Sequence, residues 1–148
     1  MSKCEDLPFE ITLEVRDTCL CLHLQRAARA VARHFDASLR PLGLTSGQFS
    51  LLMSLNRPEA ASIGDVASLL AMDRTTLTAN LKPLERRGFV TVAADNADKR
   101  TRRLTLTPAG RALLRTAAPA WRRTQAEIEC LLAESAPDRL RVDLRALS

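Results

Sequence analysis

Residues 62–107 read SIGDVASLLAMDRTTLTANLKPLERRGFVTVAADNADKRTRRLTLT, and they carry a dense series of start and stop signals. Ser62 can cap a helix, with Asp65 three residues later and apolar residues at helical spacing after it. Asp73 can cap a second helix, which Gly88 ends. Residues 89–92 and 103–107 resemble strands, joined by a polar loop. The order of elements is helix, turn, helix and hairpin, which predicts a winged helix-turn-helix.

The second of these helices divides its side chains between a core and an outer face. Leu77, Leu81 and Leu84 recur every four or three residues and are expected in the core. The other positions carry cations and short hydrogen-bonding side chains, which bind phosphates and base edges. The expected DNA-binding residues of this helix are Arg74, Thr75, Thr76, Thr78, Asn80, Lys82 and Arg86, and those of the hairpin loop are Lys99, Arg100 and Arg102.

Positive charge is concentrated in the same part of the chain. Residues 74–111 contain nine Lys or Arg against three Asp or Glu, a net charge of +6. Residues 1–73 contain seven against nine, and residues 112–148 contain six against five, so the two flanks sum to −1. A charge run is often only a solvated face, but this one coincides with the expected reading elements. The coincidence favours a phosphate-binding surface.

The hairpin carries a resemblance to a known family. Residues 98–107, DKRTRRLTLT, match the wing pattern D-x-R-x-x-x-L-x-L-T of the MarR family, and LERRGFV at residues 84–90 resembles that family's junction between recognition helix and wing. The resemblance extends over roughly residues 17–147. It implies an obligate two-fold dimer that represses or activates transcription and responds to a small molecule or an oxidant. It also implies that Asp98 holds Arg100 in place and that Arg100 enters the minor groove.

Helical patterns flank the winged part on both sides. An apolar stripe over residues 11–39 predicts one long helix, or an arm and a helix with a break near Asp17. Thr45 with Gln48 forms a capping box, and Thr107–Pro108 starts a helix expected to reach about Glu134, before a last short helix from residues 135–138. Residues 1 to about 9 are expected to form a loose arm.

These patterns define the expected fold class, mainly α with a small β-hairpin wing, in a single MarR-like domain over residues 1–148. Residues 10–44 and 108–148 would form a helical dimerisation region, and residues 45–107 the winged helix-turn-helix. The flanking helices carry more apolar surface than the small winged part can cover, which favours a homodimer. No run of about 18 apolar residues and no signal peptide is found, so the cytoplasm is the expected location and no membrane is involved.

The signal that the regulator senses is left open by the sequence. Cys19 and Cys21 lie two apart, roughly 200° around a helix, which does not suit one metal ion. Cys21 lies near the reactive cysteine of the family's peroxide-sensing branch, but that branch holds its thiolate with tyrosine hydroxyls and this chain has no tyrosine. The favoured effector is therefore an apolar or aromatic acid bound between the dimer region and the winged part, with an arginine meeting its carboxylate. Oxidant or electrophile sensing by Cys21 or Cys19 is the alternative.

Two functions of other classes are also considered. A winged helix can serve protein contacts alone, and a Cys19/Cys21 pair could act as a thiol enzyme or carrier. No Gly-rich phosphate loop, Ser-His-Asp order or paired-carboxylate motif stands out, so no enzyme, metal or cofactor is expected. The leading prediction is a repressor that binds a pseudo-palindromic site in double-stranded DNA and is released by a small molecule.

Overall fold

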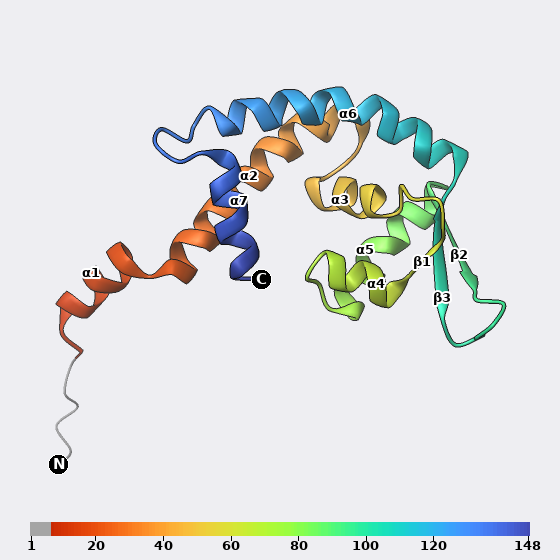
Figure 1. Ribbon diagram of the computed structural model, residues 1–148, viewed down its shortest axis with the longest axis horizontal. Coiled ribbons are helices and arrows are strands. Elements are labelled where there is room, and N and C mark those ends of the chain that lie inside the picture. The colour runs from red at the N-terminus through yellow and green to blue at the C-terminus, as the bar shows by residue number, and fades with distance from the viewer. Residues whose placement is uncertain (1–6) are drawn as a thin grey trace, which may run out of the picture.

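The computed structural model describes residues 7–148 and confirms the expected fold class. Residues 1–6 of the expected loose arm therefore lie outside the described residues, and Phe9 at its other end already begins a helix. Within them the elements follow in the order α1 Phe9–Thr18, α2 Leu20–Leu39, a 3-10 turn Arg40–Leu42, α3 Ser46–Ser54, β1 Ala61–Ser62, α4 Ile63–Leu69, α5 Arg74–Arg86, β2 Val90–Ala94, β3 Arg102–Leu106, α6 Pro108–Glu129 and α7 Pro137–Ala146. The hairpin projects at one end of the molecule, and α1 lies at the other (Figure 1).

The caps expected from the sequence start the helices of the winged part. Thr45 and Ser62 both form complete capping boxes, with Gln48 and Asp65. The Oδ1 atom of Asp73 accepts a 2.8 Å hydrogen bond from the backbone N–H of Thr76 at the start of α5. Gly88 ends that helix with φ +78°, a left-handed conformation that glycine adopts without strain. These local signals fix where α3, α4 and α5 begin and where α5 stops.

A three-stranded antiparallel sheet, in the order β1-β3-β2, supports the wing. Val90 pairs with Leu106 and Ala94 with Arg102, while Ala61 of β1 pairs with Leu104. Strand β2, expected over residues 89–92, begins one residue later, at Val90, and runs on to Ala94. Strand β1 was missed, since two residues show no alternation and one of them is also the cap of α4. It ties the helix pair directly to the hairpin.

Leu77, Leu81 and Leu84 of α5 are buried, as predicted. They belong to one core shared by the winged part and the ends of the outer helices. Its largest fully buried side chains are Leu39, Leu51, Leu52, Leu77, Leu84, Leu104, Leu106, Val66 and Val90. Because Leu39 of α2 belongs to this core, α5 packs against a core that continues into the long helices.

The long outer helices differ in detail from their expected bounds. The helical pattern over residues 11–39 does break, at Cys19, whose extended backbone (φ −69°, ψ 107°) separates α1 from α2. Helix α6 starts at the expected cap but ends at Glu129, five residues early, because Cys130 begins a turn-rich connection to α7. Helix α2 packs along α6, and in residues 7–148 no helix is long and apolar enough to span a membrane.

Candidate nucleic-acid interface

One face of α5 is open and polar. Arg74, Thr75, Thr78, Ala79 and Lys82 line it. These positions recur at helical spacing, so they project together from the side of α5 opposite Leu77 and Leu81. The hydroxyl of Thr78 donates a 2.8 Å bond to the Arg74 carbonyl oxygen, so its proton is committed while its oxygen can still accept a hydrogen bond. Ala79 was not among the expected residues, although its spacing of four from Thr75 marks it, and its methyl group suits a thymine methyl.

Two of the expected reading residues point elsewhere. The hydroxyl of Thr76 donates a 2.6 Å bond to Oδ2 of Asp73, so Thr76 is part of the cap. This bond lowers the pKa of Asp73 and keeps its carboxylate charged at the helix start. Asn80 lies with Nδ2 3.7 Å from the sulfur of Met72, on the side of α5 that faces the turn after α4. Arg86 is exposed in the last turn of α5.

The wing loop is organised by Asp98 through backbone contacts. Its Oδ1 accepts a 3.0 Å bond from the backbone N–H of Arg100, and its Oδ2 accepts a 3.1 Å bond from the Thr101 hydroxyl. Asp98 therefore contacts Arg100 through the main chain. Asp98 shapes the main chain at Arg100 and makes no hydrogen bond with its guanidinium group, which is exposed, as are Lys99 and Arg102.

An ion pair between Arg103 and Asp95, at the base of the wing loop, was not predicted from the sequence. Nη2 of Arg103 lies 3.0 Å from Oδ2 of Asp95, and Nε of Arg103 lies 3.2 Å from the same oxygen. The hydrogen bond from Arg103 lowers the pKa of Asp95. The two residues are eight apart in the sequence and meet only because β2 and β3 pair, so no local motif marks them. The pair removes Arg103 from the set of free cations and braces the wing.

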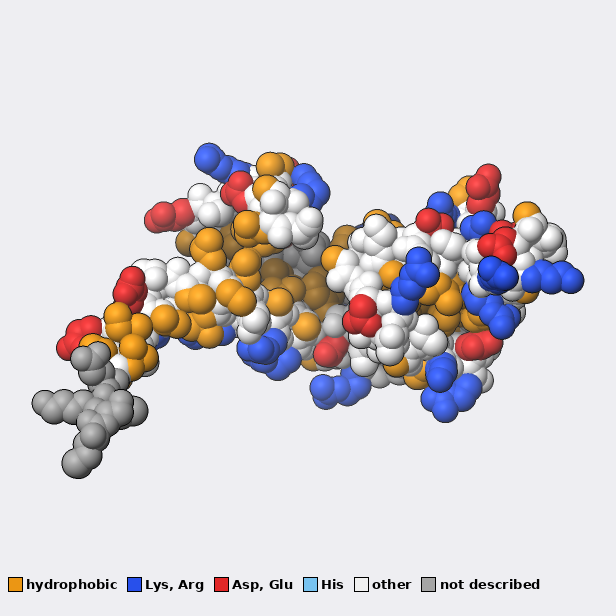
Figure 2. Space-filling view, turned by 90° about the horizontal axis from the view of Figure 1, so that it is seen from below, with side chains coloured by type: hydrophobic (Ala, Val, Ile, Leu, Met, Phe, Trp, Pro, Cys, Tyr) orange, Lys and Arg blue, Asp and Glu red, His pale blue; other side chains and the backbone are white. Residues whose placement is uncertain are grey.

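The recognition helix and the wing meet at a polar recess of about 330 Å³. It is lined by Ser62, Ile63, Gly64, Arg74, Thr78, Arg100, Thr101 and Arg102. Three of the expected cations, Arg74 from α5 and Arg100 and Arg102 from the wing, thus share one site. Lys and Arg side chains also crowd this end of the molecule in the space-filling view, whereas apolar side chains gather over the end formed by α1, α2 and α7 (Figure 2).

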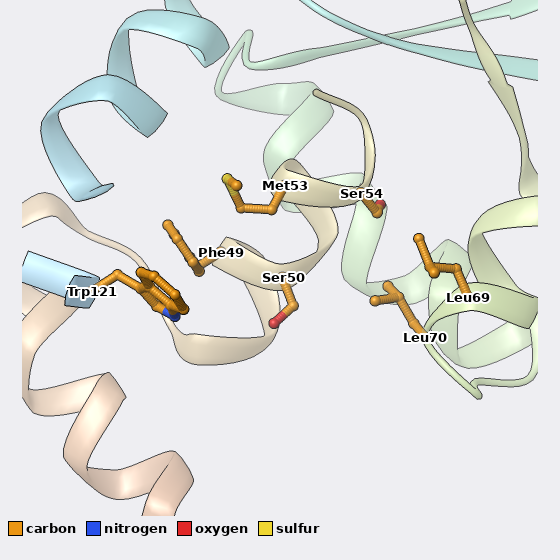
Figure 3. Close-up of a pocket in the computed structure, with 7 residues that line it drawn as sticks. All are labelled: Phe49, Ser50, Met53, Ser54, Leu69, Leu70 and Trp121. Carbon is orange, nitrogen blue, oxygen red and sulfur yellow. The ribbon is translucent and has the colours of Figure 1, made fainter. Parts of the chain in front are cut away.

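An apolar pocket of about 370 Å³ lies apart from these polar residues and shares none of them. Its lining residues come from α3, the end of α4 and α6: Phe49, Ser50, Met53, Ser54, Leu69, Leu70 and Trp121 (Figure 3). The rings of Phe49 and Trp121 stack at a centroid distance of 6.3 Å. The pocket lies where an effector was expected, between the winged part and a long helix. Its lining in the described chain contains no arginine, contrary to the carboxylate partner expected there.

The two candidate sensor cysteines lie at the junction of α1 and α2. Cys21 is exposed, and its sulfur accepts a 3.2 Å hydrogen bond from Nε2 of Gln25. Cys19 is partly buried and occupies the N-cap position of α2, where its side chain makes no capping hydrogen bond. The expected angle of roughly 200° between the two side chains holds only in one continuous helix. Because the helix breaks at Cys19, this angle does not apply to Cys19 and Cys21.

Comparison with known proteins agrees with this geometry. The sequence model of the MarR family matches residues 44–101. Mycobacterium tuberculosis MosR, solved in complex with DNA, is 38% identical with a TM-score of 0.80, over 88% of this chain and 93% of that one. The transcriptional activatory protein BadR of Rhodopseudomonas palustris is 35% identical over 95 residues, 62% of this chain and 54% of BadR.

A third relative concerns effector control. BpsR of Bordetella bronchiseptica, whose DNA binding is regulated by 6-hydroxynicotinic acid, is 27% identical with a TM-score of 0.72, over 86% of this chain and 89% of that one. The chain spans about half the length of BadR but nearly all of MosR. It belongs to the MarR family, and these relatives are transcriptional regulators rather than enzymes.

Proposed function

We propose that the protein is a homodimeric, sequence-specific DNA-binding regulator of transcription in the cytoplasm, acting as a repressor that a small ligand releases. The observation that carries the proposal is the recess in which cations from α5 and from the wing converge. A protein-interaction module would not need unpaired guanidinium groups at the place where a reading helix and a wing meet. A thiol enzyme would leave this basic surface without a role.

The dimer follows from apolar surface that one chain leaves uncovered. Exposed apolar residues lie on α1, on α2, and on α7 and its C-cap: Phe9, Val15, Leu20, Val142 and Leu147. Apolar patches of this kind mark an interface in a folded protein. A second copy of the chain would cover them if residues 10–44 and 108–148 of both chains intertwine. Residues 45–107 of each chain would then present a winged helix-turn-helix.

Such a dimer would read a pseudo-palindromic site. Each α5 would enter a major groove with Thr75, Thr78 and Ala79 against base edges, and each wing would place Arg100 in the neighbouring minor groove. The two recognition helices would need a separation of about one helical turn of DNA, roughly 34–36 Å. Thr76 and Asn80, whose side chains face the cap and Met72, would support this face rather than contact bases.

Replacing Arg100 tests the wing contact. Arg100→Ala is expected to weaken binding to the selected operator by about 1–3 kcal/mol, the range of one specific base contact. The side chain of Arg100 is exposed and forms no hydrogen bond or ion pair within residues 7–148, so the thermal stability and assembly state are expected to stay unchanged. Fluorescence anisotropy on an operator obtained by selection from random duplexes measures the effect. Undiminished affinity would remove Arg100 from the interface.

The apolar pocket supports the ligand part of the proposal. Its volume of about 370 Å³ suits a small aromatic molecule, with Phe49 and Trp121 available for stacking and the Ser50 hydroxyl for a hydrogen bond, since the Ser54 hydroxyl donates to the Leu51 carbonyl oxygen. A ligand there would contact α3, α4 and α6 at once. It could therefore change the position of the winged part relative to the long helices. The carboxylate of an aromatic acid would need an arginine from the second chain, since the lining of this chain offers none.

Cysteine-based sensing is kept as a second candidate because the Cys21 thiol is exposed beside a break between helices. Oxidation or alkylation at this junction would insert polar or bulky atoms where two chains are proposed to pack, which costs about 1–3 kcal/mol. If this cost applies only to the conformation that binds DNA, it would weaken DNA binding by roughly tenfold to a hundredfold.

A single variant separates the two signals. We expect 6-hydroxynicotinic acid, used as a probe of aromatic acids, to quench the fluorescence of Trp121 and to release DNA equally from the wild type and from Cys21→Ser. Peroxide, hypochlorite and a thiol-reactive electrophile are expected to release DNA from neither. Release by an oxidant from the wild type but not from Cys21→Ser would instead assign the signal to Cys21.

A further inference from the structure

We propose that the recess between α4, α5 and β3 seats one phosphate of the DNA backbone, and that Gly64 is the positioning residue that lets Arg74 lie in it. The inference rests on the proposed function, because it assigns a particular contact within the DNA interface. Gly64 itself has no side chain to offer. Its role is to leave space for the guanidinium group of another residue.

The charged donors in the recess are arginines, beside the Ser62 hydroxyl, whose oxygen accepts a hydrogen bond from the backbone N–H of Asp65. The hydroxyl of Thr78 donates to the Arg74 carbonyl oxygen, and the hydroxyl of Thr101 donates to Oδ2 of Asp98, so both hydroxyl protons are committed. Arg74 and Arg102 pair with no carboxylate in residues 7–148, so both are available to a bound phosphate. Arg100 also lines the recess, but its guanidinium group is the one proposed to enter the minor groove. Uncompensated guanidinium groups in one recess of about 330 Å³ fit a tetrahedral anion with several acceptor oxygens.

The place of the recess identifies the anion. A helix in the major groove and a wing in the adjacent minor groove stand on either side of one sugar-phosphate strand. The recess lies between these two elements, with Arg74 on the helix and Arg102 on the wing. A backbone phosphate would therefore pass directly over it. Contacts of this kind hold the protein in register on the duplex and carry no base sequence.

Gly64 controls where Arg74 lies. A methyl group at position 64 would lie 3.1 Å from Nη2 of Arg74 and 3.8 Å from Cζ, so the guanidinium group occupies the space that any larger side chain would take. Gly47 provides a matched comparison. Both glycines are the second residue of a helix that begins with a complete capping box, and a methyl group at position 47 would meet only the Thr45 hydroxyl oxygen, at 4.0 Å.

The test uses full-length protein and a fluorescein-labelled random-sequence duplex of about 30 base pairs, because a phosphate contact is independent of sequence. Gly64→Leu is expected to weaken binding about fivefold to tenfold and to reduce the slope of log affinity against log salt by about one. Gly64→Ala is expected to have a smaller effect of the same sign. Gly47→Leu is expected to bind as the wild type does. Circular dichroism and thermal melting confirm that all variants fold.

A double-mutant cycle decides whether Gly64 acts through Arg74. Arg74→Ala is expected to weaken binding to the random duplex and to lower the salt slope as Gly64→Leu does, and combining the two is expected to add nothing further. Additive losses would mean that the leucine obstructs DNA directly and would overturn the positioning role. An unchanged salt slope in both single variants would overturn the phosphate seat. Absence of binding by the wild type would count against the proposed function instead.

Discussion

Leu20→Glu is expected to convert the dimer into a folded monomer at micromolar concentration. Leu20 begins the apolar stripe of α2, and 70% of its side chain is exposed in a single chain. The substitution therefore removes little from the fold of one chain, but it places an uncompensated charge in the proposed interface. Such a charge costs about 3–5 kcal/mol, which weakens the dimer at least about a hundredfold. Sedimentation velocity would show the 16.3 kDa chain in place of a species of twice that mass.

Leu69→Glu is the matched control for assembly. Leu69 is 67% exposed, almost as much as Leu20, but it lies at the end of α4 in the winged part. We expect this variant to remain dimeric. If Leu20→Glu sediments as the wild type does, or if the wild type itself is a monomer, the division of the chain into a dimerisation region and a winged part is wrong.

Gly110→Ala is expected to destabilise the fold by about 3 kcal/mol, at the upper end of the usual cost of overpacking. A methyl group at position 110 would overlap the carbonyl oxygen of Phe89 and lie 3.2 Å from Cδ2 of Leu106. That carbonyl also accepts a 3.1 Å hydrogen bond from the backbone N–H of Thr107, so it cannot move away freely. The substitution would push the start of α6 away from the base of the wing.

Chemical denaturation measures this effect, with Gly47→Ala as the control. At position 47 a methyl group meets almost nothing, so the usual gain of about 0.5–1 kcal/mol for replacing a helical glycine by alanine is expected. An equal response at both positions would contradict the close approach of α6 to Phe89. The same contact fixes the angle at which the winged part joins the long helix, and Gly110→Ala should therefore also weaken DNA binding.

The parts of the fold that were predictable depend on neighbouring residues in the sequence. The caps at Thr45, Ser62, Asp73 and Thr107 act within three residues of themselves, and each starts a helix where expected. The buried leucines of α5 follow from helical periodicity alone. The net charge of residues 74–111 likewise marks the elements that carry the basic surface, because charge follows from composition alone.

The parts that were missed depend on contacts between distant residues. Strand β1 exists only because Ala61 and Ser62 find a partner in β3. Arg103 contacts Asp95 only because their strands pair. The side chain of Thr76 donates a hydrogen bond to Asp73, and that of Asn80 donates one to the sulfur of Met72. Composition marks a polar residue on a helix as available for DNA, and only the fold shows whether its hydrogen bonds are already committed.

Two chains are proposed to bind one duplex through α5 and the wing. The most direct measurement is sedimentation of the wild-type protein with a labelled duplex carrying an operator selected from random sequence, repeated over a range of salt concentrations. We predict one complex of two chains per duplex, with affinity that falls steeply as salt rises and with clear preference over random DNA. If the protein binds no duplex at low salt, or binds all sequences equally as a single chain, it is not a dimeric, sequence-specific regulator.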